Sequence, residues 1–221
     1  MPGFTPEALF FDMDGLLLDT ERVGCDVFLE LTAPFGIARD KAEAFYRSLV
    51  GTSNTHTRSS IAEFMSGVDA DAMMRDWRVG VDARMASAVP LRPTVRDTLM
   101  ALARKGHRMA VVTSTVKDRA LEHLDAAGLL PHFATVVGGD DVAANKPDPA
   151  PYLEAAGRLG VDPRRSAAFE DSDHGVASAV AAGCIVTQIP DLRPSEAPLP
   201  DLGQRLAGDL ADAVKGIGLL T

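Results

Sequence analysis

Short apolar runs of strand length recur along the chain and, in its second half, alternate with stretches of helical periodicity. The runs that predict strands are 8–11, 108–113, 134–138, 166–169 and 184–187. The stretches that predict helices in this half are 117–127, 149–159, 176–182 and 206–214. Strands that are apolar throughout and alternate with helices are typical of a parallel sheet covered on both faces. The pattern therefore predicts an α/β fold.

The stretch 20–88 has a different pattern and contains no convincing strand. It predicts consecutive amphipathic helices at 23–33, 41–49, 59–65 and 70–85. Pro90 and Pro93 mark the point where the strand-and-helix pattern begins again. We therefore expect a helical domain, 20–88, inserted into a core domain formed by 1–19 and 89–221.

The chain of 221 residues is acidic, with a formal net charge of -9 and a pI of about 5.0. It has no cluster of Lys and Arg that could displace counterions from nucleic acid, so we expect no nucleic-acid partner. An anionic substrate would have to be attracted by a local positive site rather than by the whole surface.

Cysteine usage and hydropathy point to a cytoplasmic protein. The two cysteines, Cys25 and Cys184, lie far apart and form neither a disulfide framework nor a metal-binding spacing. No apolar segment approaches the roughly 20 residues that a membrane span requires, and the N-terminus lacks the pattern of a secretory signal. We expect a monomer or small homo-oligomer with no membrane partner.

The first apolar run leads directly into Asp12, Met13, Asp14 and Gly15. Carboxylates at alternate positions of an extended segment point to the same side, and glycine permits a tight turn directly afterwards. Two acids at a strand end are costly in a core, but they suit a site that holds a divalent cation or attacks phosphorus. Taken alone, the run also fits an acidic turn after an edge strand.

Polar side chains follow other predicted strands as well. Thr113 and Ser114 follow the second strand, Glu170 and Asp171 follow the fourth, and Lys146 lies beyond the third. In open α/β sheets ligands bind at the carboxyl ends of the strands, so these groups can converge. Carboxylates suit Mg²⁺, and hydroxyl and backbone N–H groups suit a phosphate. Lys146 would offset the repulsion between a carboxylate and a phosphate, which is several kcal/mol at about 4 Å.

Four segments, taken together and in order, resemble the motifs of the haloacid dehalogenase superfamily. They are 12–15, 111–114, 146–149 and 169–172. The resemblance covers the whole chain and looks closest to phosphatases related to β-phosphoglucomutase and to phosphogluconate and glycerol-phosphate phosphatases. It implies a Rossmann-like parallel-sheet core with an inserted α-helical cap. It also implies Mg²⁺ as cofactor and a small phosphorylated metabolite, such as a sugar, polyol or sugar-acid phosphate, as substrate.

The resemblance also implies a role for each motif residue. Asp12 would be the nucleophile that forms an aspartyl-phosphate, and Asp14 would protonate the leaving oxygen and then take a proton from water. The residues implied as binding the phosphoryl group are Thr113, Ser114 and Lys146. The residues implied as holding Mg²⁺ are Asp12, Asp14 through its carbonyl, Asp171 and Glu170, the last either as a direct ligand or behind the ligands.

The stretch 51–58 matches the place where related enzymes read the leaving group of the substrate. Its candidate substrate-binding residues are Gly51, Asn54 and Arg58, with Arg58 suited to a second anionic group. A helix start with solvated side chains is the alternative for this stretch.

A phosphomutase that uses the same aspartyl-phosphate is the competing function. In the mutases that the chain resembles, a cap histidine and a cap arginine lie near the positions of Gly24 and Asn54, so the sequence favours hydrolysis. Asp14 argues against haloacid chemistry, because the dehalogenases lack a carboxylate there. A non-catalytic module would have lost an acid or the lysine, and all are present.

Overall fold

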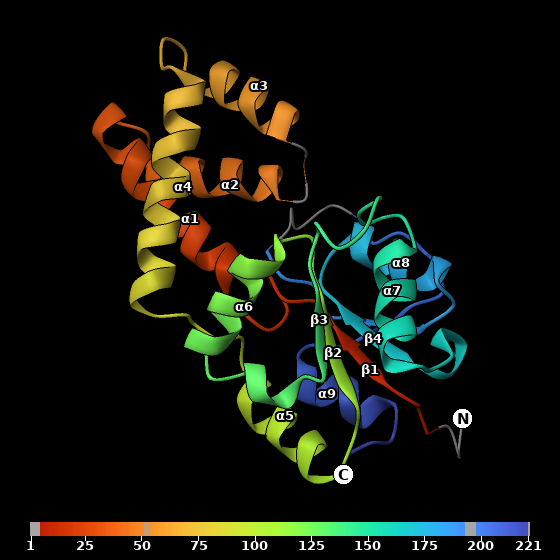
Figure 1. Cartoon of the computed structure of the whole chain (residues 1–221). Helices are drawn as coiled ribbons and strands as arrows, with labels where there is room; N and C mark the ends of the chain where they lie inside the picture. The colour runs from red at the N-terminus through yellow and green to blue at the C-terminus, as the bar shows by residue number, and fades with distance from the viewer. Residues whose placement is uncertain (1–4, 51, 53, 193–197, 221) are drawn as a thin grey trace. The chain divides into compact units, whose positions relative to one another are not determined.

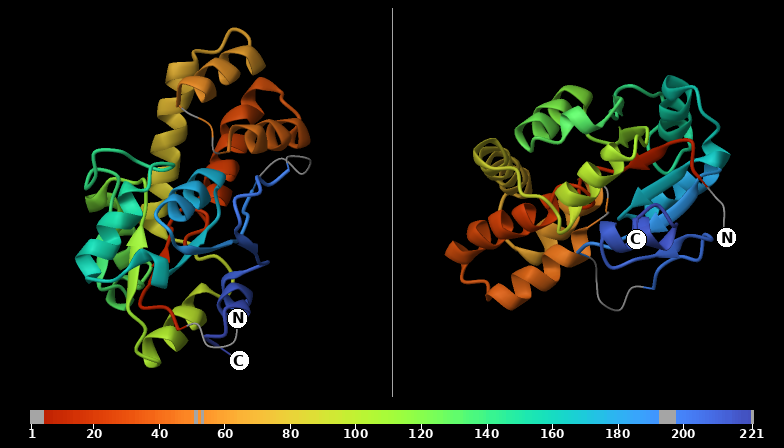
Figure 2. Two further views of the ribbon diagram at one scale, coloured as in Figure 1. Left: turned by 90° about the vertical axis from the view of Figure 1, so that its right-hand side faces the viewer. Right: turned by 90° about the horizontal axis from the view of Figure 1, so that it is seen from below.

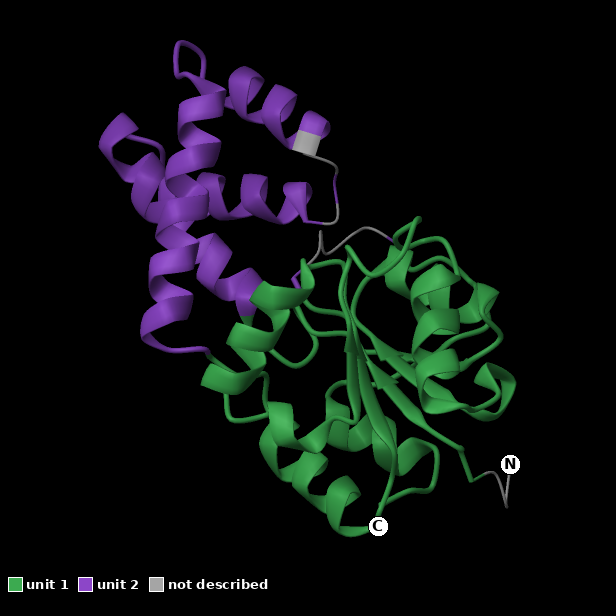
Figure 3. Cartoon of the chain, in the orientation of Figure 1, with its two compact units in different colours: residues 1–19, 90–191, 199–221 green, residues 20–89, 192–198 purple. Residues whose placement is uncertain are grey.

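The computed structural model describes residues 5–50, 52, 54–192 and 198–220 (Figure 1). The chain forms two compact units, shown in different colours in Figure 3. The α/β unit contains residues 1–19, 90–191 and 199–221, and the helical unit contains residues 20–89 and 192–198.

Six parallel strands form one sheet among the described residues, in the order β3-β2-β1-β4-β5-β6. The strands are β1 (Leu9–Phe11), β2 (Met109–Val112), β3 (Thr135–Val137), β4 (Ala167–Glu170), β5 (Ile185–Gln188) and β6 (Arg205–Leu206). Phe11 of β1 pairs with Val111 of β2 on one side and with Phe169 of β4 on the other. The predicted α/β class with a parallel sheet is confirmed. This register brings the residues that follow β1, β2 and β4 to the same edge of the sheet.

Helices cover the sheet on both faces (Figures 1 and 2). The helices of the α/β unit are α5 (Val95–Arg104), α6 (Lys117–Ala126), α7 (Ala150–Leu159), α8 (Asp173–Ala181) and α9 (Leu210–Gly216), with short 3-10 turns at Leu130–His132 and Pro163–Arg165. On one face α7 packs against β2 and β3, and α8 packs against β4 and β5. On the other face α5 packs against α9.

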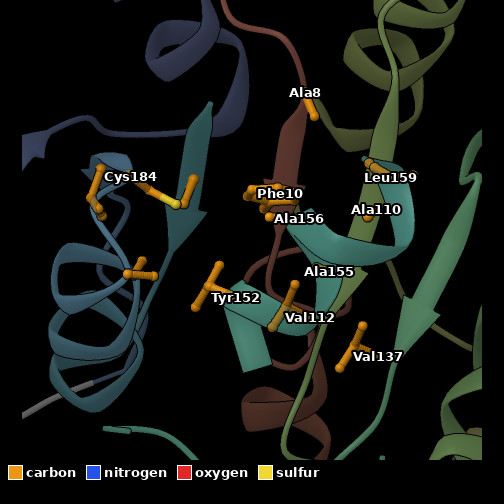
Figure 4. Close-up of a cluster of buried hydrophobic side chains, with 14 of the residues drawn as sticks. Ala8, Phe10, Ala110, Val112, Val137, Tyr152, Ala155, Ala156, Leu159 and Cys184 are labelled. Carbon is orange, nitrogen blue, oxygen red and sulfur yellow. The ribbon is translucent and has the colours of Figure 1, made fainter. Parts of the chain in front are cut away.

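The core of the α/β unit explains why its strands are apolar throughout. Phe10 points toward α7, where its ring meets Tyr152 edge-on with the centroids 6.1 Å apart, within a cluster that α8 completes (Figure 4). Phe11, its neighbour, points to the other face and contacts Phe133. Because successive side chains of a strand point to opposite faces and both faces are covered, β1 requires apolar residues at every position.

The helical unit is built on aromatic packing. Its helices are α1 (Thr20–Thr32), α2 (Arg39–Leu49), α3 (Asn54–Phe64) and α4 (Ala70–Ser87), with a 3-10 turn at Ala33–Phe35. The ring of Phe28 contacts those of Tyr46 and Trp77, and the rings of Phe45 and Phe64 stack with centroids 3.9 Å apart. These contacts join α1, α2, α3 and α4 into one core.

The structure contains two elements that the sequence pattern did not predict, α5 and β6. The prolines before α5 indicated only a return to the core, although its apolar residues have helical spacing and Leu99 and Leu102 are fully buried. The two residues of β6 are exposed, so no apolar run marks this edge strand. The last helix begins at Leu210 rather than at 206, because the side chain of Asp209 accepts a hydrogen bond from the Asp212 N–H and starts the helix there. None of the described helices combines the length and apolar character needed to cross a membrane.

Candidate active site

The acidic turn after β1 depends on Gly15. Its φ of 83° lies in the left-handed region that favours glycine, and its N–H donates to the Leu18 carbonyl at 2.9 Å. A Cβ atom at this position would lie 2.4 Å from Asp171 Oδ2. Glycine therefore allows the chain to turn after Asp14 and lets Asp171, at the end of β4, approach the turn closely.

Lys146 joins the ends of three strands. Its Nζ donates to Asp12 Oδ1 at 2.5 Å, to Glu170 Oε1 at 2.6 Å and to the Val112 carbonyl at 2.8 Å. The exposed fractions of the Lys146, Asp12 and Glu170 side chains are 5%, 9% and 0%. A buried cation thus faces two buried carboxylates, which keeps the desolvated charges paired.

Burial and ion pairing shift the pKa values of Asp12 and Lys146 in opposite directions. Burial raises the pKa of Asp12 well above its ordinary value; Lys146 opposes the rise, and Glu170 and Asp14 add to it. Burial alone would lower the pKa of Lys146, but the carboxylates of Asp12 and Glu170 outweigh burial and raise it. Lys146 therefore stays protonated, and the ionised form of Asp12 depends on positive charge beside it.

Glu170 is held from several sides. Its Oε1 also accepts from the Tyr152 hydroxyl at 2.5 Å, and its Oε2 accepts from the Ser172 hydroxyl at 3.4 Å. A Cβ atom on Gly175, in the first turn of α8, would lie 1.9 Å from Glu170 Oε2. The carboxylate of Glu170 thus packs against α8 at a point where any side chain larger than that of glycine would collide with it.

Three carboxylates gather at this edge of the sheet. Asp12, Glu170 and Asp171 each offer an oxygen atom, and these atoms all lie within 4.8 Å of one another. An all-oxygen set of this charge fits a hard divalent cation. Lys146 and Tyr152 both donate to Glu170 Oε1, so two hydrogen bonds already engage this oxygen of the set.

The carboxylate of Asp14 has different neighbours from that of Asp12. The Thr115 hydroxyl donates to Asp14 Oδ2 at 2.7 Å, and the Thr113 hydroxyl lies 3.4 Å from the same atom. Thr113 Oγ1 accepts from the Thr115 N–H at 3.0 Å, so the turn after β2 is internally braced. Ser114, between them, is exposed. Asp14 is therefore held by hydroxyl groups, whereas Asp12 is held by a cation.

The candidate residues of stretch 51–58 belong to the helical unit. Gly51 lies outside the described residues, and Asn54 begins α3. Arg58 makes a two-pronged ion pair with Asp71 of α4, each hydrogen bond measuring 2.7 Å. Its described contacts thus lie within the helical unit.

The sequence reasoning did not identify Tyr152, Thr115 and Gly175 as part of the site. Each leaves a signal in the sequence. Tyr152 lies on an otherwise apolar helix face, where its hydroxyl needs a partner. Thr115 completes a run of three hydroxyl residues after β2, and Gly175 lies within a helical stretch that alanine would favour.

Comparison with known proteins identifies the family of the chain. The family model for haloacid dehalogenase-like hydrolases matches residues 9–189. A phosphorylated carbohydrates phosphatase of Thermotoga maritima is 31% identical over 181 residues, which cover 80% of this chain and 82% of the relative. The fructose-1-phosphate phosphatase YqaB of Escherichia coli is 33% identical over 180 residues, which cover 79% of this chain and 92% of the relative.

A solved structure has the same fold. The HAD family hydrolase from Deinococcus radiodurans R1, with bound phosphate and sodium, superimposes with a TM-score of 0.81 at 26% identity and covers 99% of both chains. The resemblance found in the four motifs is confirmed: the chain belongs to the haloacid dehalogenase-like hydrolase family.

Proposed function

We propose that this hydrolase is a Mg²⁺-dependent phosphatase that acts on a small phosphorylated metabolite through an aspartyl-phosphate on Asp12. The observation that carries the proposal is the separation of the two aspartates, Asp12 beside Lys146 and Asp14 beside Thr115. Two carboxyl groups in such different surroundings can perform two different tasks. The names of the relatives, which include a carbohydrate phosphatase and a fructose-1-phosphate phosphatase, support a sugar-phosphate substrate.

In the first step a carboxylate oxygen of Asp12 attacks phosphorus, and the bond between phosphorus and the leaving oxygen breaks. Asp14 gives its proton to that oxygen. In the second step water attacks phosphorus and Asp14 takes its proton, which releases phosphate and restores Asp12. Thr113, Ser114 and Lys146 hold the phosphoryl oxygens during both steps.

Mg²⁺ would be held by Asp12, Asp171 and the Asp14 carbonyl, with Glu170 behind them. When bound, it neutralises negative charge on the phosphoryl oxygens. The positive charge of Lys146, which contacts Asp12, would add to this neutralisation, and the Glu170–Tyr152 contact keeps the lysine in place.

The helical unit supports hydrolysis over the phosphomutase alternative. Gly24, near the position where the related mutases place a histidine, is buried in α1, and a Cβ atom there would lie 2.6 Å from Tyr46 Oη. That hydroxyl is fixed by hydrogen bonds to Glu21, at 2.9 Å to the carbonyl and 2.7 Å to Oε2. A side chain at position 24 would therefore require repacking of this unit.

A panel of sugar, polyol and sugar-acid phosphates tests the proposal. We expect release of inorganic phosphate with Mg²⁺, none after EDTA treatment, and none from Asp12→Asn. Asp125→Asn, a change of an exposed acid on α6, is the control and should retain full activity.

A second experiment traps the intermediate. With p-nitrophenyl phosphate, whose leaving group needs no proton, Asp14→Asn should accumulate a phosphoryl group on the peptide that contains Asp12. Equal activity of Asp12→Asn and wild type would refute the nucleophile. Conversion of a sugar 1-phosphate to its 6-phosphate faster than hydrolysis, followed by phosphorus NMR, would establish the mutase instead.

A further inference from the structure

Three of the four boundaries between the units converge on one arginine. The chain leaves the α/β unit after Asp19, returns to it at Pro90 and leaves it again after Asp191. Arg92 lies two residues beyond the second boundary. Its Nη1 is 2.7 Å from Asp191 Oδ1 and 3.9 Å from Asp19 Oδ1. One guanidinium group thus connects the segments at all three boundaries.

Backbone hydrogen bonds connect two of the same segments. The Arg92 N–H donates to the Leu17 carbonyl at 3.0 Å, and the Asp19 N–H donates to the Pro90 carbonyl at 2.9 Å. Leu18 and Leu91 form an isolated antiparallel bridge between them. The segment that follows the acidic turn of Asp12 and Asp14 is therefore paired with the segment that carries Arg92.

The ion pairs of Arg92 are sheltered from water. The exposed fractions of the side chains are 13% for Arg92, 16% for Asp19 and 4% for Asp191. Charge-assisted hydrogen bonds in such surroundings are stronger than those at the surface, and removing the cation leaves two carboxylates close to each other. Arg92 therefore offsets a local excess of negative charge.

This charge lies beside the candidate metal site. A Cβ atom on Gly15 would be 2.4 Å from Asp171 Oδ2 and 3.6 Å from Asp191 Oδ2, so both carboxylates approach the same side of Gly15. A phosphate dianion that enters beside Asp171 would also approach Asp191. Pairing of Asp191 with Arg92 reduces the repulsion that the dianion meets.

We propose that Arg92 is a positioning residue for phosphate-ester hydrolysis. It neutralises Asp191 and Asp19 beside the acidic site and holds the three boundary segments together, without contacting the reacting atoms. The kinetic part of this proposal rests on the proposed function.

Arg92→Gln tests the electrostatic part. We expect KM for a sugar phosphate to rise about tenfold while kcat changes little, because the loss of the Arg92 charge makes the potential beside the site more negative and the groups that perform the chemistry are unchanged. The increase should shrink at high ionic strength, where the repulsion is screened. Arg165→Gln, which removes the partner of Glu7 in the same unit, is the control for loss of one positive charge and should leave KM unchanged.

Two further variants separate the effect of the lost Arg92 charge from a disturbance of the fold. Arg92→Gln combined with Asp191→Asn restores the local net charge and should lower KM toward the wild-type value. Arg92→Lys keeps the charge, and its KM should lie between those of wild type and Arg92→Gln. If the glutamine variant does not fold, the lysine variant still allows the test.

Hydrogen exchange tests, without any substrate, whether Arg92 holds the boundary segments together. The amides of Asp19 and Arg92 should exchange faster in Arg92→Gln and in the double variant than in wild type or Arg165→Gln. Unchanged exchange in Arg92→Gln would refute the holding role, and an unchanged KM or one insensitive to salt would refute the electrostatic role. A wild-type protein that hydrolyses nothing would instead refute the proposed function, and the exchange result would still stand.

Discussion

The hydroxyl of Tyr152 donates to Glu170 Oε1 at 2.5 Å, on the same oxygen that accepts from Lys146. Burial raises the pKa of Tyr152 well above its ordinary value, and the charges of Glu170 and Asp12 raise it further, so the hydroxyl remains a donor. Tyr152, a member of the hydrophobic cluster of Figure 4, thereby holds the carboxylate of Glu170 in place, and that carboxylate in turn holds Lys146.

Tyr152→Phe should lower activity because Glu170 would lose one of the two donors on this oxygen. The phenyl ring would keep its packing against Phe10. Substitution of residues that support a metal site in this way typically lowers activity roughly 10- to 100-fold. Loss of a hydrogen bond to a charged group should lower the free energy of unfolding by about 1.5–3 kcal/mol. Steady-state kinetics and urea denaturation measure the two effects.

Tyr46→Phe is the control for Tyr152→Phe. It removes a hydroxyl that donates to Glu21 Oε2 in the helical unit. Its stability should fall, but its kcat should stay near that of wild type. Equal kcat values for Tyr152→Phe and wild type would contradict a role of this hydrogen bond in the site.

Gly175→Ala should damage the site although alanine is the better helix residue. The added Cβ would lie 1.9 Å from Glu170 Oε2 and would push the carboxylate away from Lys146. We expect loss of most activity and a stability cost of about 1–3 kcal/mol from overpacking. Gly157→Ala in α7 is the matched control, because a Cβ there meets no atom within 4 Å and should stabilise the helix by about 1 kcal/mol. Equal activity and stability of Gly175→Ala and Gly157→Ala would contradict the close packing of Glu170 against α8.

Thr115→Val should impair proton transfer. It removes the 2.7 Å hydrogen bond to Asp14 Oδ2 but keeps the size of the side chain. General acid catalysis contributes roughly 10²- to 10⁴-fold, so a misdirected Asp14 should lower kcat about tenfold, with a small change in KM. Thr115→Ser should retain activity. The defect should be smaller with p-nitrophenyl phosphate than with a sugar phosphate, and equal defects on both substrates would argue against this role.

Asp141 should contribute to stability above about pH 4. Hydrogen bonds from Arg158, the Gly138 N–H and Lys117 lower its pKa from 3.8 to about 2, with burial opposing them. Because the unfolded chain binds this proton more readily than the folded one, the contribution is complete above the unfolded pKa and is lost as the pH falls from about 4 to 2.

Urea denaturation at several pH values measures this effect. The difference in unfolding free energy between wild type and Asp141→Asn should be largest at pH 5 and shrink toward pH 2. Asp125→Asn, at an exposed position, controls for the change in net charge. A difference that does not vary between pH 5 and pH 2 would show that the pKa of Asp141 is not lowered.

The central strand and the clustered motif residues could be predicted because their signals are local. Asp12 and Asp14 directly follow an apolar run, and parallel strands carry the ends of neighbouring runs to the same edge. Lys146 was included from its place beyond the third predicted strand and from its charge, and its contact with Asp12 spans 134 residues of sequence.

The remaining contacts depend on packing that no short pattern encodes. Tyr152 reaches Glu170 only because α7 lies on the sheet at a particular rotation, and Gly175 matters only because Glu170 points at α8. Arg92 pairs with Asp191 across 99 residues of sequence, next to prolines that signalled a turn. Helix α5 follows these prolines directly, and its start at Thr94 has a φ of 65° that no capping motif announces.

The central place of β1 has a consequence for synthesis of the protein. β1 is made before the other five described strands, yet both of its sheet partners, β2 and β4, follow the whole helical stretch 20–89. The helical unit can gather its aromatic core while β1 still lacks both neighbours. The carboxylates after β1 meet Lys146 and Asp171 only after β4 and the turn that follows it have been made, and such long-range pairing is slow. A truncated chain that ends before β4 would therefore leave one side of β1 without its sheet partner and the acidic cluster incomplete.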